Sequence, residues 1–113
     1  MVTVEDVRAL ARTLPRSSEH LIRDRVKFRV GSIVYVAFSR DETTMGFGYP
    51  KEERDALVAT EPHLFLLPGP ADLRFNWVCC RLTPLSHDRM TDLVTEAWRM
   101  VVPKFLARQR LGC

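Results

Sequence analysis

Hydrophobic residues recur along this chain with two periods, which predict helices at both ends and strands between them. Residues 3–14, with Thr3 as the cap, place apolar side chains three to four positions apart, the spacing of one helix face. A longer stripe of this kind covers 86–106, with Ser86 as its cap. Pro103 should kink that helix because its nitrogen cannot donate a hydrogen bond. Residues 50–62 predict a shorter helix that begins and ends at a proline.

Residues that alternate with a period of two predict strands over 26–30, 43–49 and 74–82. Residues 33–39 are apolar on both faces, which predicts a strand in the centre of the sheet. Gly31 and Ser32 suit the tight turn of a hairpin between the first two strands. The polar stretch 16–25 and the segment 65–73 are expected to be connections. The predicted order is α-β-β-β-α-β-α over a single domain of residues 1–113. This order predicts an α+β two-layer sandwich, with helices on one face of an antiparallel sheet.

Strand alternation also predicts which side chains occupy the sheet face that the helices leave open. Val78 and Cys80 should point toward the helices, and Cys79 should point away from them. The two adjacent cysteines therefore cannot hold one metal ion, and a bridge between them would distort the strand. On this alternation the open face holds Lys27, Arg29, Ile33, Tyr35, Trp77, Cys79 and Arg81.

Charge and cysteine content limit the kinds of function that are expected of this protein. The net charge is +3, and the C-terminal tail from Ala97 onward has no acidic residue and four basic ones, Arg99, Lys104, Arg108 and Arg110. Such cations are typical of a helix C-terminus, which they stabilise through the macrodipole, and a nucleic-acid contact is the alternative explanation. Three cysteines without zinc spacing, no long apolar run and no signal peptide predict a cytoplasmic protein without a metal, cofactor or membrane span. Since no nucleophile–base pair or paired carboxylates are found, we expect no enzyme activity.

An ordered set of motifs extends over nearly the whole chain: "VEDVRALARTLP", "FRVGSIVYVAFS", "YPKEERDAL", "FNWVCCRL" and "EAWRMVVPKFLA". Together they resemble the MmcQ/YjbR family of small bacterial proteins. The resemblance implies a two-layer fold similar to CyaY-like proteins and type III secretion chaperones. It also implies DNA binding in which two β-hairpins act as wings. Gly48 and Cys79 stand where family members often carry basic or polar residues, which makes the open face of this chain less cationic.

Three functions are open for this face. The first is nucleic-acid binding, in which cations neutralise phosphates and aromatic rings stack on bases; its residues are Lys27, Arg29, Tyr35, Arg40, Arg74, Trp77 and Arg81. Of these, Arg40 would lie at a wing tip. The second is binding of a protein partner or a second copy, because exposed apolar patches mark such interfaces. The third is a small-ligand pocket walled by residues 66–73, with room left by Gly46 and Gly48.

Overall fold

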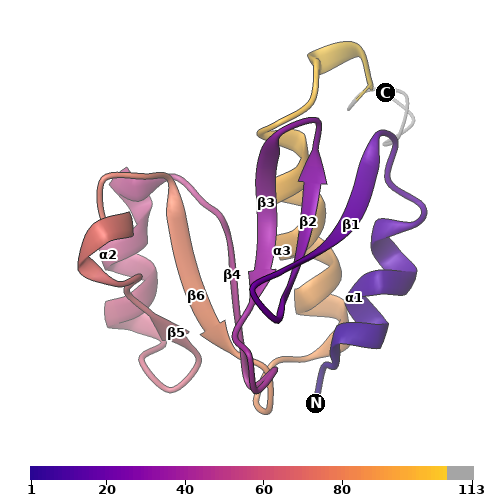
Figure 1. The fold of residues 1–113 in the computed structure, drawn as a ribbon. Coiled ribbons are helices and arrows are strands. Elements are labelled where there is room, and N and C mark those ends of the chain that lie inside the picture. Colours follow the sequence, from indigo (N-terminus) through magenta and orange to yellow (C-terminus); the bar gives the residue numbers. More distant parts are fainter. Residues whose placement is uncertain (107–113) are drawn as a thin grey trace.

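The computed structural model describes residues 1–106, in which an antiparallel sheet of six strands packs against helices (Figure 1). This arrangement confirms the predicted α+β class. The order of strands across the sheet is β1-β2-β3-β4-β6-β5. The strands are β1 Ser17–Ile22, β2 Arg25–Val30, β3 Ile33–Phe38, β4 Thr44–Gly48, β5 Phe65–Leu66 and β6 Trp77–Arg81. The helices are α1 Val4–Ala11, α2 Lys51–Thr60 and α3 His87–Arg99, and a short 3-10 helix, η1, spans Pro70–Asp72.

The hydrophobic core lies between the sheet and the helices α1 and α3. The predicted stripe of α3 is buried, with Met90, Val94 and Trp98 all inaccessible to solvent. The Trp98 indole Nε1 also donates a hydrogen bond of 2.9 Å to the Pro15 carbonyl, which ties α3 to the segment after α1. Burial of each large apolar side chain stabilises the fold by about 1.5–3 kcal/mol.

Both predicted helix caps are present. The Thr3 hydroxyl accepts a hydrogen bond from the Asp6 backbone N–H, and the Asp6 carboxylate accepts one of 2.9 Å from the Thr3 N–H. The Ser86 hydroxyl accepts a hydrogen bond of 3.1 Å from the Arg89 N–H at the start of α3. These bonds satisfy backbone donors that have no partner within the first turn of a helix.

The last helix is shorter than its apolar stripe predicts. α3 ends at Arg99, residues 100–103 are not helical, and residues 104–106 are helical again. Pro103 is the physical reason, because its nitrogen cannot donate to a carbonyl one turn earlier and its ring crowds that turn. The proline therefore breaks the helix where a kink was expected. Of the basic tail, Arg108 and Arg110 lie outside the described residues.

Two strands were not predicted. β1 lies at the edge of the sheet within the polar stretch, and β5 has only two residues. The polar residues of β1 have partners that the sequence does not show, since Glu19 forms an ion pair of 2.7 Å with Arg8 of α1. Arg23 and Asp24 join β1 to β2, and both have positive φ, as a type I′ hairpin turn requires.

Tyr35 faces the core, so its predicted place on the open face is wrong. The pairing of β2 with β3 shifts at this point, because Phe28 pairs with Val36 while Arg29 pairs with Val34. Tyr35 is the extra residue of a β-bulge, which re-aims its side chain. The side chain is fully buried, and its hydroxyl shares a hydrogen bond with Ser17. Val34, which alternation placed in the core, lies on the open face instead.

Replacement of Tyr35 by phenylalanine should lower the free energy of unfolding by about 1 kcal/mol, because the partly buried Ser17 hydroxyl loses its partner. Urea denaturation measures this change. Tyr35→Phe combined with Ser17→Ala should be no less stable than Tyr35→Phe alone. Additive losses in the double variant would show that the two hydroxyls do not act as a pair.

Candidate binding cleft on the open sheet face

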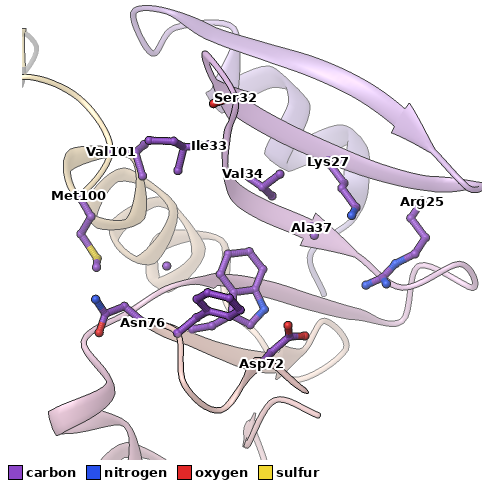
Figure 2. Close-up of a pocket in the computed structure, with 13 residues that line it drawn as sticks. Arg25, Lys27, Ser32, Ile33, Val34, Ala37, Asp72, Asn76, Met100 and Val101 are labelled. Carbon is purple, nitrogen blue, oxygen red and sulfur yellow. The ribbon is translucent and has the colours of Figure 1, made fainter. Parts of the chain in front are cut away.

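The open face of the sheet is hollowed into a cleft of about 690 Å³ (Figure 2). Three parts of the chain form its walls: strands β2 and β3, the segment 72–77, and the residues directly after α3. This open-face cleft brings together Lys27 and Ala37 from the sheet, Asp72 and Trp77 from the segment, and Met100 from the end of α3. Its volume is in the range of pockets that enclose small organic ligands.

Trp77 lies directly against the backbone of β4. A β-carbon on Gly46 would be only 2.5 Å from the Trp77 Nε1, so this position accepts no side chain while the indole stays in place. Gly46 was expected to leave room on this face, and its bare backbone does allow a close approach. The approaching group is the protein's own indole, which occupies the space that the sequence analysis had left for a ligand.

Two cations and one carboxylate line the cleft. Figure 2 shows Arg25 and Lys27 on the side of the sheet and Asp72 on the opposite wall. Within residues 1–106, the side chains of Lys27 and Asp72 form no hydrogen bond or ion pair. Arg25 donates from Nε to the Phe38 carbonyl at 3.0 Å, which leaves its terminal nitrogens free for another partner. Arg25 was not among the predicted site residues, although it continues the alternation of Lys27 and Arg29 along one strand.

A buried arginine of α2 holds the 72–77 wall in place. Arg54 is 7% exposed and donates to the carbonyls of Leu73 at 2.9 Å, Phe75 at 3.1 Å and Trp77 at 3.0 Å. Hydrogen bonds from a charged donor are about twice as strong as neutral ones. Arg54 thus fixes the backbone that carries Trp77. In the sequence Arg54 stands among solvated charges at the start of a helix, and nothing there distinguishes it from them.

The predicted nucleic-acid residues are only partly brought together. Lys27 and Trp77 share the open-face cleft, whereas Tyr35 is in the core. Arg29 is half-buried and donates to the His20 ring at 3.0 Å, so it is committed to the neighbouring strand.

The other three predicted cations do not line the cleft. Arg40 donates from Nε to the Arg23 carbonyl at 3.2 Å, which places the β1–β2 and β3–β4 turns side by side. Arg74 is exposed and stacks on the ring of Phe75, with its guanidinium carbon 4.7 Å from the ring centroid. Arg81 is exposed and donates to the Pro62 carbonyl at 3.0 Å.

The adjacent cysteines point to opposite faces, as alternation predicts. Cys80 is fully buried in the core, and burial raises its pKa to about 12. Cys79 is half-buried, and burial, together with the nearby Asp72 carboxylate, raises the pKa of its thiol. A raised pKa keeps a thiol protonated, which is the opposite of what a nucleophile needs. Across residues 1–106, no three His, Cys, Asp or Glu side chains are grouped so that they could hold a metal ion.

Comparison with known proteins identifies the family of the chain and finds a solved structure with a similar fold. The YjbR family model matches residues 12–100, and the chain belongs to the YjbR family. The crystal structure of Deinococcus radiodurans protein DR2400, which has a DUF419 domain, is similar, with a TM-score of 0.78 and 21% identity over 99% of this chain and 89% of that chain. At this identity the likeness shows the fold alone. No curated protein matches the chain. In the described part, no helix combines the length and the apolar character that crossing a membrane requires.

Removal of the buried guanidinium should destabilise the protein far more than removal of an exposed neighbour. Arg54→Gln should lower the free energy of unfolding by about 3 kcal/mol or more, because three carbonyls lose a charged donor. Lys51 of the same helix donates to the exposed Arg74 carbonyl, so Lys51→Gln should cost less than about 1 kcal/mol. Equal losses in urea denaturation of the two variants would contradict the role given to Arg54.

The two thiols should differ in reactivity at pH 8. In a Cys113→Ser variant, which removes the cysteine outside the described residues, Cys80 should react with a thiol reagent only after unfolding. Cys79 should react in the folded protein, but more slowly than a free thiol, because its raised pKa leaves little thiolate. Mass-spectrometric labelling in the absence and presence of denaturant measures both rates. Fast labelling of Cys80 in the native protein would contradict its burial.

Proposed function

We propose that this protein is a non-enzymatic DNA-binding protein that holds the phosphate backbone against its open sheet face. The observation that carries the proposal is a separation of charge between the two layers. Residues 17–48 and 74–82, which contain five of the strands, hold seven basic and four acidic residues, whereas α1, α2 and α3 together hold five basic and eight acidic residues. An anionic partner is therefore attracted to the sheet side and repelled by the helical side.

Ion pairs increase this difference in charge between the sheet side and the helical side. In residues 1–106 every ion pair uses an arginine that contacts the helical side: Arg8 with Glu5 and Glu19, Arg89 with Glu61, and Arg99 with Glu96. The cations in and around the open-face cleft have no carboxylate partner in this part of the chain. They therefore need not break an existing ion pair before they contact a phosphate.

The hairpin turns support the same proposal. Because Arg40 donates to the Arg23 carbonyl, two turns form one edge beside the cleft with an arginine in each. An edge built from two β-hairpins corresponds to the pair of wings that the family resemblance implies. The same turns also carry Asp24, Asp41 and Glu42, whose charges weaken the positive field at this edge. Hydrogen bonds from Ser39 and Thr43 lower the pKa of Asp41 and keep its carboxylate ionised.

DNA binding should weaken steeply as salt rises, because four to five phosphate contacts give a slope of about −4 in a plot of log K against log salt. Lys27→Gln should reduce the magnitude of this slope by about one and weaken binding at low salt. Arg12→Gln removes one positive charge from the exposed end of α1 and should leave the slope unchanged. Fluorescence anisotropy with a duplex of about 20 base pairs, roughly two helical turns, measures both. Absence of binding at low salt, or equal effects of the two variants, would contradict the proposal.

A protein partner or a second copy of the chain is a second candidate, favoured by one observation. Three large apolar side chains at the cleft are exposed: Ile33 at 53%, Phe75 at 50% and Met100 at 44%. Contiguous apolar surface of this kind is typical of interfaces. Sedimentation equilibrium tests the homodimer form, since a strict monomer at high concentration would exclude it.

A further inference from the structure

We infer that the open-face cleft takes an unpaired base, so that the protein prefers single-stranded to double-stranded nucleic acid. This inference rests on the proposed function and names its substrate class. It concerns the cleft itself, because the separation of charge between the layers does not explain why the open face is hollowed.

The shape and chemistry of the cleft fit a base better than they fit a duplex. Cations lie on one wall only, while much of the remaining lining is apolar, with Val34, Ala37 and Val101 among its members. A duplex presents a convex, charged backbone and would leave this apolar lining uncovered. An unpaired base is a small planar group with two apolar faces, and a cleft of this volume has room for the base together with its sugar and phosphate.

The cleft also contains a rigid aromatic surface. The Trp77 indole is held against Gly46, and the Trp77 backbone carbonyl accepts a hydrogen bond from buried Arg54. Both its ring and its backbone are thus fixed before any ligand arrives, which lowers the entropy lost on binding. Half-exposed Phe75 adds a second ring in the same wall. Bases stack on such rings without regard to sequence.

The charged groups suit a nucleotide that is not base-paired. Lys27 and Arg25 can contact a phosphate on one side, while the Asp72 carboxylate, which has no partner within residues 1–106, lies on the other. A carboxylate repels a phosphate backbone, but it accepts hydrogen bonds from amino and imino groups of a base. In a duplex those groups are already used in base pairs, whereas in a single strand they are free.

The test compares one fluorescein-labelled strand of about 20 nucleotides, alone and annealed to its complement, by fluorescence anisotropy at constant salt. The single strand should bind at least about fivefold more tightly, which is the lower limit for one stacked base. Trp77→Ala should remove this preference while duplex binding persists. Gly46→Ala should do the same without loss of an aromatic ring, because the new methyl group displaces the indole. Phe105→Ala, an exposed aromatic outside the cleft, is the matched control and should change neither affinity.

The outcomes separate this inference from the proposed function. Equal affinity for both forms, with salt dependence intact, would overturn the inference and leave the proposed function standing. Absence of binding to either form at low salt would overturn both. If Trp77→Ala, shown to be folded by thermal denaturation, lost duplex binding as well, Trp77 would act as a wedge in double-stranded DNA, and the inference would again be wrong.

Discussion

The contact between the Trp77 indole and the bare backbone of Gly46 determines the form of the open sheet face. Any side chain on Gly46 would force the ring away from β4, since a β-carbon would be 2.5 Å from Nε1. Arg54 also donates a hydrogen bond to the Trp77 carbonyl, which fixes the start of β6. The side chains that follow along β6 therefore point alternately toward the core and toward the open face. Val78 and Cys80 then enter the core, while Trp77 forms part of the cleft. The contact between Trp77 and Gly46 therefore contributes both to the packing of the sheet and to the shape of the cleft.

The helical layer and the open sheet face differ in their contributions to the protein. The helical layer supplies burial and charge pairing, with Trp98 at its centre and the ion pairs of Arg8, Arg89 and Arg99 around it. The open face has an aromatic surface, exposed apolar side chains, and cations that form no ion pair with a carboxylate in the described part of the chain. Because the core-facing side chains of both the sheet and the helices supply the burial, the open face tolerates features that a stable surface would otherwise avoid.

The sequence predicts the features that depend on local spacing. The α3 stripe, the helix caps, and the opposite directions of Cys79 and Cys80 follow from helical and strand periods. The edge strand β1 could not be predicted in this way, because it is largely exposed to solvent and has no alternation of apolar and polar residues. Tyr35 was misplaced for a different reason: a bulge adds one residue to β3, and only the pairing with β2 reveals it. The cleft itself depends on contacts between distant segments, so the roles of Arg54 and Asp72 could not be predicted from spacing.

The most direct test of the account is an NMR titration with a short oligonucleotide that follows the two tryptophan indole N–H signals. The Trp77 signal, assigned with a Trp77→Phe variant, should shift as the oligonucleotide binds. The Trp98 signal should stay in place, because its N–H is buried and donates to the Pro15 carbonyl. Binding that leaves the Trp77 signal unchanged while resonances of α1 or α2 shift would contradict the claim that the open face is the binding surface.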